Sequence, residues 1–383
     1  MRFKTLLFTV AVVSMAAAVF AQDASKITPY ASVRYFIGAY YRDKDFSGIT
    51  DSKGKKKADI DMVNSIVNTS RLGVKFEKGA VSGEAQVHLG PGHGGMVQDA
   101  LIYGTFKSSF GLEVMAGQTE APFAYQNANE AWDQNGNGLG SSQYPRSPQL
   151  MISFTGFYVD FIRAPRFQPS SNIGYEQDVY GGRDVYMPLT AVGYELKSDL
   201  ADIGIGAAGF KYSVKDTSGS IKGDDRDAWT YIGYLHGTIK LGAPYIKFNA
   251  TYQKSPYMLG MQALSHFNSG SGMHTHALPQ SSSGGNNSSL DSGNVMDAFF
   301  EGYIEFGFKT EFGTLAVNAA YEKNLDAPKG RADRMAAGLN FAIPIVSGFK
   351  VTPTALYMNQ LKNRAGVKQG SDLLAGLKLQ WDL

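Results

Sequence analysis

Runs in which apolar and polar residues alternate recur along most of this chain. In the segments 246–253, 300–309 and 314–322, one set of alternate positions is mainly apolar and the other set is mainly polar. Successive side chains of a β-strand point to opposite faces of its sheet, so each run predicts a strand with one apolar and one polar face. The chain is therefore expected to be all-β.

The alternation and the turn-forming residues between the runs predict sixteen strands. Strand boundaries are the weakest part of such an interpretation, so counts of fourteen and eighteen stay open. The predicted strands lie near residues 28–41, 66–77, 82–90, 97–108, 111–119, 147–155, 157–163, 186–197, 201–213, 227–240, 244–256, 296–309, 314–323, 332–342, 349–359 and 371–383.

The connections between these strands alternate between two kinds. One kind is a short turn, as at 79–81 and 310–313, and the other is a longer polar segment, as at 120–146 and 257–295. Among the second kind only 90–96 is short. Short turns at one rim and long loops at the other are typical of an antiparallel transmembrane β-barrel, with periplasmic turns and extracellular loops. We therefore expect a closed barrel of sixteen strands.

Composition favours this barrel over a soluble sandwich of two sheets. Charged residues make up 18% of the chain, below the roughly 25% of ordinary soluble domains. A barrel in lipid exposes only alternate residues to the acyl chains, which fits the mean hydropathy of -0.19. The chain contains no cysteine, which excludes a lipid anchor on cysteine, a disulfide framework and a thiolate metal site.

Residues 1–21 have the pattern of a cleaved signal peptide. Arg2 and Lys4 form a positive start, an apolar stretch follows, and Val19-Phe20-Ala21 matches a cleavage site. The apolar stretch is shorter than the about 20 residues of a membrane-spanning helix, which disfavours an uncleaved anchor. Residues 22–383 then form one barrel domain, exported to the bacterial outer membrane.

Two stretches resemble the Gram-negative general porins. The segment Ser70-Arg71-Leu72-Gly73-Val74-Lys75-Phe76 is similar to the signature of their second strand. The segments 103–106 and 110–118, which read YGTF and FGLEVMAGQ, look like their fourth and fifth strands. The resemblance covers residues 28–163 and extends to the rest only through topology. Gly117 departs from it, because many members carry an arginine there.

This resemblance implies a water-filled channel for passive diffusion of small hydrophilic solutes and ions. It also implies that the third loop, residues 120–146, folds into the barrel and narrows it. Opposed charges then line the constriction, because a transverse field orients dipolar solutes. The residues carried over are acids of the loop and bases of the facing wall: Glu120, Glu130, Asp133, Arg34, Arg71 and Lys75. For each, the alternative is a solvated charge elsewhere in the lumen.

Three other motifs carry weaker signals. Asp133, Asn135 and Asn137 match the first half of a calcium loop, but its last ligand would fall on Tyr144, so a Gly/Asn turn is the better interpretation. The loop 257–295 contains three histidines and reads as a flexible surface loop. The basic run 53–57 is either a contact for lipopolysaccharide phosphates or a solvated loop tip.

The remaining expectations concern partners and competing functions. Without Arg2 and Lys4 the chain has 34 basic and 34 acidic residues, which gives no support for a nucleic-acid partner. We expect outer-membrane lipids, lipopolysaccharide, solutes and ions as partners, with no cofactor and no enzymatic activity, and leave monomer or homotrimer open. The alternatives are a surface adhesin or binding protein that uses 257–295, and a barrel enzyme.

Overall fold

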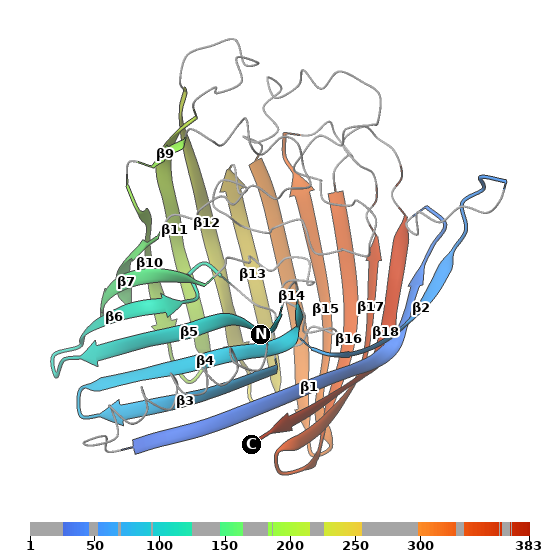
Figure 1. Ribbon diagram of the computed structural model, residues 1–383, viewed down its shortest axis with the longest axis horizontal. Helices are drawn as coiled ribbons and strands as arrows, with labels where there is room; N and C mark the ends of the chain where they lie inside the picture. The colour runs from blue at the N-terminus through green and yellow to red at the C-terminus, as the bar shows by residue number, and fades with distance from the viewer. Residues whose placement is uncertain are drawn as a thin grey trace.

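In the computed structural model, the described residues form one continuous β-sheet (Figure 1). The structure describes residues 26–45, 53–67, 70–92, 95–124, 146–163, 183–185, 187–214, 226–254, 298–326, 333–359, 361, 368 and 370–383. The expected signal peptide 1–21 lies outside these ranges. No helix in the described part is long and apolar enough to cross a membrane.

Eighteen strands lie within the described residues. The first nine are β1 (Lys26–Arg42), β2 (Asp59–Ile66), β3 (Ser70–Lys78), β4 (Val81–Gly92), β5 (Gly95–Lys107), β6 (Leu112–Thr119), β7 (Ser147–Phe154), β8 (Phe157–Ile162) and β9 (Arg183–Val185). The others are β10 (Leu189–Lys197), β11 (Ala201–Val214), β12 (Arg226–Lys240), β13 (Pro244–Lys254), β14 (Ala298–Thr310), β15 (Gly313–Asn324), β16 (Asp333–Val346), β17 (Phe349–Asn359) and β18 (Ser371–Asp382).

These strands occupy sixteen positions around a closed antiparallel barrel, as the sequence predicted. β2 and β3 pair with successive stretches of β1 and so share one position. β9 and β10 share another position, because both pair with β11. The barrel closes where β1 pairs with β18, from Ser32 opposite Asp382 to Arg42 opposite Asp372. Closure leaves no unpaired sheet edge along these strands.

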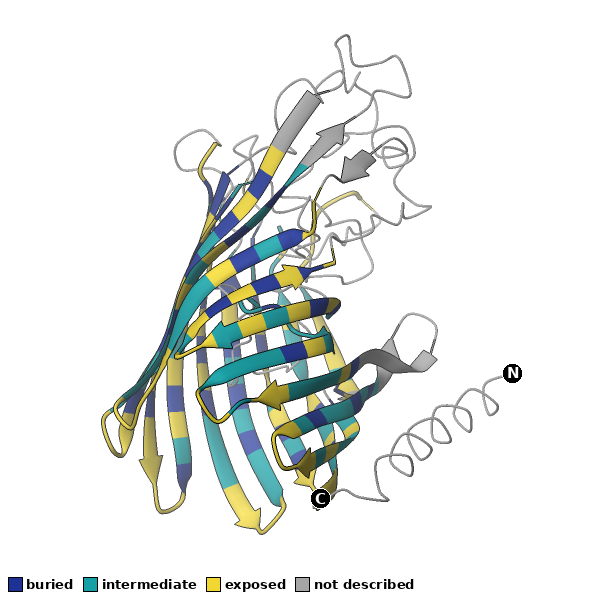
Figure 2. Ribbon diagram, turned by 90° about the vertical axis from the view of Figure 1, so that its left-hand side faces the viewer, coloured by how far each residue is buried: buried dark blue, intermediate teal, exposed yellow. Residues whose placement is uncertain are grey.

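The predicted sidedness of the strands is confirmed. Phe306, Val317 and Leu339 are 56%, 51% and 47% exposed, whereas Glu305 and Lys378 are buried. Figure 2 shows the same alternation of buried and exposed residues along the strands. Apolar side chains therefore cover the outer wall and polar side chains face the lumen. Of the other residues predicted to face lipid, Tyr252 and Trp381 are exposed and Phe248 is half-buried. Of the other residues predicted to face the lumen, Lys247 and Asn318 pair with Glu305 on the inner face.

One predicted boundary is wrong. The sequence placed a loop at 42–65, but β2 begins at Asp59 and pairs with the upper part of β1. The cause is visible in the residues: Ile60 and Met62 are exposed on the outer wall, while Asp61 forms an ion pair with Arg42 inside. In the sequence, the charged residues around 59–66 hid this short alternation of apolar and polar residues, so the segment was assigned to a loop.

The lumen is less uniformly polar than the sequence predicted. A cluster of buried apolar side chains lies on the inner wall of the barrel, around the place where the first strand, β1, pairs with the last strand, β18. Its members are Phe36, Val67, Ala336, Leu356, Met358 and Leu374, with Tyr40, Val63 and Ala320 packed against them. Val67 belongs to the segment between β2 and β3, and its amide donates to the carbonyl oxygen of Arg34, 2.9 Å away. The cluster therefore holds this segment against β1.

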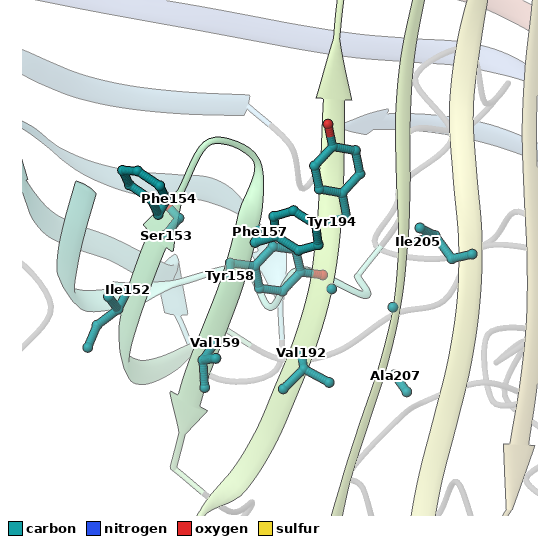
Figure 3. Close-up of a pocket in the computed structure, with 12 residues that line it drawn as sticks. Ile152, Ser153, Phe154, Phe157, Tyr158, Val159, Val192, Tyr194, Ile205 and Ala207 are labelled. Carbon is teal, nitrogen blue, oxygen red and sulfur yellow. The ribbon is translucent and has the colours of Figure 1, made fainter. Parts of the chain in front are cut away.

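The outer wall over β7 to β11 is hollowed by an apolar groove, shown in Figure 3. Phe157 and Tyr194 stack at a tilt beside it, with ring centroids 4.6 Å apart. The groove ends near Thr155 and Gly156, which have φ values of 48° and 91° and close the turn between β7 and β8. Two positive φ values are what a tight two-residue hairpin turn requires.

Candidate functional site

Two of the predicted bases lie together on the inner face of β3. Arg71 pairs with Ser32 and Lys75 pairs with Thr28, so both belong to the face that carries Tyr30 on β1. The guanidinium carbon of Arg71 is 6.0 Å from the centroid of the Tyr30 ring, and Nζ of Lys75 is 5.6 Å from it. Both cations therefore sit over one aromatic face, an arrangement that is electrostatically favourable.

Tyr30 is held flat against the wall. Its hydroxyl donates to Glu84 of β4 and lies 2.7 Å from Oε1 of Gln86. Its ring lies over Gly73, where an added Cβ would come within 2.4 Å of the ring. Glycine at this position therefore lets the ring cross β3 and reach Glu84 and Gln86 of β4. The result is a compact group of two cations, one ring and one carboxylate on the lumen wall.

The ends of the third loop are joined by an ion pair. Nη2 of Arg146 lies 3.1 Å from Oε1 of Glu120 and 3.0 Å from Nε2 of His88 on β4. Nε2 of Gln149 on β7 donates to the carbonyl oxygen of Glu120 at 2.9 Å. Glu120 therefore pairs with Arg146 at the other end of its own loop.

The start of the third loop enters the lumen. Phe123 is 0% exposed, and its ring centroid lies 6.2 Å from that of Tyr234 on β12. Four strand positions separate β6, where the loop begins, from β12. An outward loop would leave Phe123 in water, so the predicted inward fold is confirmed for residues 120–124. Ala121, which is 3% exposed, is buried with it.

The other predicted site residues are placed as follows. Arg34 lies on β1 with Nε 3.3 Å from the hydroxyl oxygen of Ser32, and it pairs with Gln380 of β18. Glu130 and Asp133 lie outside the described residues, as do the weak calcium ligands Asp133, Asn135 and Asn137. No group of three or more His, Cys, Asp or Glu residues with metal-binding spacing occurs in the part of the chain that is described. The structure thus brings together Arg71 and Lys75.

Two residues of this wall were not predicted as site residues: Tyr30 and Arg146. Tyr30 occupies an inward position of the alternating run at the start of β1, which was readable from the sequence. Arg146 was predicted as the last residue of the third loop, and it does directly precede the strand β7. A basic residue at the junction of a long loop and a strand was the available signal.

Gly117 also has a structural role. Its φ of 143° is unfavourable for other residues, and an added Cβ would lie 2.3 Å from the carbonyl oxygen of Ile102 on β5. An arginine here, as in many porins, would require the backbone of β5 and β6 to move apart. The backbone of β5 and β6 around Gly117 therefore leaves no room for a basic side chain at this position.

Comparison with known proteins gives a match at the level of fold. No protein-family model matches the chain, and no curated protein sequence matches it. The outer membrane channel DcaP of Acinetobacter baumannii aligns with a TM-score of 0.58 and 14% identity, over 94% of this chain and 97% of that one. The anion-selective porin from Comamonas acidovorans gives 0.54 and 14%, over 93% and 99%.

A third solved structure, Salmonella typhi OmpF in complex with daunomycin, aligns with a TM-score of 0.55 and 10% identity, over 94% of this chain and 99% of that one. At such identities the likeness establishes the fold alone. It agrees with the barrel and with the resemblance that the sequence indicated.

Proposed function

We propose that this protein is a porin of the bacterial outer membrane, which lets small hydrophilic solutes and ions diffuse through a water-filled lumen. The observation that carries the proposal is the buried Phe123, which fixes the start of the third loop against β12 inside a closed barrel. A loop fixed across a water-filled lumen sets the size of the pore. In a barrel whose interior is filled by side chains, a loop could not have this role. Export by the signal peptide 1–21 belongs to the same proposal.

The outer wall supports a membrane location. Apolar side chains on alternate positions, among them Ile205, Phe306 and Val317, are each more than half exposed. Such a surface is stable in hydrocarbon but costly in water. Outer-membrane lipids, with lipopolysaccharide around the long loops, would then surround the barrel. The solved structures with this fold include an outer membrane channel and an anion-selective porin.

The lumen wall supports passage of charged and polar solutes. Arg71 and Lys75 stand on one wall, with Arg34 on the neighbouring strand. In this proposal the acids Glu120, Glu130 and Asp133 of the third loop complete the constriction. Opposed charges across a narrow pore set ion preference. Because Glu120 pairs with Arg146, the field at the constriction reflects this ion pair together with the other two acids.

Planar-bilayer recording tests the proposal. The purified, refolded protein should give stable single-channel steps, and deletion of 127–139 should enlarge them. A deletion of equal length at 278–290, in the loop predicted at 257–295, is the matched control and should leave the conductance unchanged. A folded barrel that conducts no ions would refute the function, and would favour the adhesin or the barrel enzyme instead. Unchanged conductance after the first deletion would remove the third loop from the constriction.

A further inference from the structure

Asp160 is a carboxylate buried in an apolar environment. It lies on the inner face of β8, is 0% exposed, and neither of its carboxylate oxygens has a hydrogen-bond partner. Its partners across the neighbouring strands are Met151 on β7 and Ala191 on β10. An ionised carboxylate buried without a partner costs several kcal/mol, so such groups are normally paired or bind a cation.

Two buried tyrosines lie on the same inner wall, one cross-strand pair along from it. Tyr158 and Tyr234 are 6% and 4% exposed and reach toward each other from β8 and β12. A Cβ added to Gly193 would lie 2.4 Å from the hydroxyl oxygen of Tyr158, and a Cβ added to Gly206 would lie 2.4 Å from that of Tyr234. Gly193 and Gly206 are direct partners on β10 and β11, so the two hydroxyls lie over the two glycines of one cross-strand pair. Figure 3 shows the Tyr158 hydroxyl pointing from β8 toward β10.

Asp160 and the two tyrosines lie on the same inner wall, where Phe123 of the third loop packs on Tyr234. Tyr158 and Asp160 are alternate residues of the same strand, and the hydroxyl of Tyr234 has no hydrogen-bond partner among the described residues. Phe123 packs on the ring of Tyr234 and closes the side toward the lumen. The floor is made of small residues, with Ala191 and Ala208 beside the glycine pair. Within hydrogen-bonding reach of Asp160, the described side chains supply no cation to neutralise it.

The charge of the site selects its occupant. One carboxylate with two neutral hydroxyls and the faces of aromatic rings balances a single positive charge, whereas a divalent ion would leave a net charge in an apolar recess. The nearest other titratable groups face the same wall one row closer to the short turns, where Glu195 and His236 both pair with Gly204. We propose that Asp160, Tyr158 and Tyr234 bind a monovalent cation, either an alkali ion or the ammonium head of a solute, and that the bound cation stabilises the packing of Phe123.

Cation-dependent stability tests this proposal without any reference to conduction. Unfolding by urea is followed in sodium, potassium, methylammonium and N-methyl-D-glucamine chloride at equal ionic strength. The N-methyl-D-glucamine cation is too bulky for the site, so its chloride salt serves as the blank. At an ion concentration ten times its dissociation constant, the folded-to-unfolded ratio of the natural protein should rise about tenfold over the blank. A rise in sodium or potassium identifies an alkali-ion site, and a rise in methylammonium alone identifies an ammonium site.

Two variants make the test specific. Asp160→Asn should lose the dependence on the cation and should be at least as stable as the natural protein in the blank. Tyr234→Phe removes one hydroxyl and should weaken the dependence, which keeps the proposal testable if Asp160→Asn fails to fold. Asp202→Asn is the control, because this acid pairs with Lys240 at 2.7 Å near the short turns, and it should keep the full dependence. Equal stability of the natural protein in all four salts would overturn the proposal, as would a full cation effect in Asp160→Asn.

Discussion

Phe123 and Tyr234 are 111 residues apart in the chain, yet their rings lie 6.2 Å apart between centroids, inside the barrel. Phe123 belongs to the loop after β6, and Tyr234 belongs to β12. The contact joins the start of the third loop to the lumen wall at β12 through one aromatic pair. It therefore connects the position of the third loop to the width of the proposed pore.

We expect Phe123→Ala to raise single-channel conductance. Removing a fully buried aromatic ring costs about 3–5 kcal/mol where the cavity does not refill, so the loop should lose its attachment to β12. Conductance and its open-state noise in planar bilayers measure the effect. Phe312→Ala is the control, since Phe312 is 69% exposed in the turn between β14 and β15. If Phe123→Ala leaves the conductance unchanged, as the control should, then the attachment of the third loop to β12 does not limit the pore.

We expect Arg71→Glu to shift the reversal potential toward cation preference. The substitution changes the charge of the wall by two units beside Tyr30 and Lys75, where Arg71 projects into the lumen. Arg71→Lys keeps the charge and should keep the preference, which separates charge from shape. The measurement is the reversal potential in a salt gradient. An identical reversal potential in the two variants would place Arg71 outside the constriction.

The pair of Glu120 and Arg146 should be coupled energetically. Arg146 has 8% of its side chain exposed and contacts both Glu120 and His88, so Arg146→Met removes two interactions at once. Urea unfolding of Arg146→Met, Glu120→Gln and the double variant forms a double-mutant cycle. We expect a coupling energy of about 0.5–3 kcal/mol, the range for residues in contact. Strictly additive effects would mean that the pair does not hold the ends of the loop together.

Much of the barrel could be predicted from the sequence, because alternation reports directly on a wall with one lipid face. Phe306 and Glu305 show why: neighbouring residues face opposite media, and the pattern repeats along β14. The same rule placed Arg71 and Lys75 on one face. The alternation of short and long connections then favoured a closed barrel over a sandwich.

The contacts inside the lumen were beyond the sequence. Alternation tells which residues point inward, but not which of them meet across the barrel. Phe123 and Tyr234 illustrate this, since their contact depends on how far the loop reaches. Asp160 illustrates it too, because its inward position was readable while its isolation among apolar residues depends on three neighbouring strands.

The buried ion pair of Glu322 and Arg334 should dominate the stability of the β15–β16 wall. Their side chains are 5% and 6% exposed, and Glu301 of β14, opposite Glu322, is fully buried beside them. Arg334→Met would leave two buried carboxylates without their cation. Breaking one partner of a buried pair typically costs 3–5 kcal/mol, and we expect a loss of about that size in urea unfolding.

Two further variants decide whether the loss comes from the uncompensated charge. Lys350→Met breaks an exposed pair with Asp382, in which the charged atoms are 3.6 Å apart and the side chains are 39% and 47% exposed, and such pairs contribute only about 0–1 kcal/mol. It should therefore be nearly neutral. The double variant Arg334→Met with Glu322→Leu removes both charges and should recover a large part of the lost stability, since a buried pair replaced by apolar residues is often neutral. A double variant as unstable as Arg334→Met would show that Arg334 acts through packing of its side chain rather than through its charge.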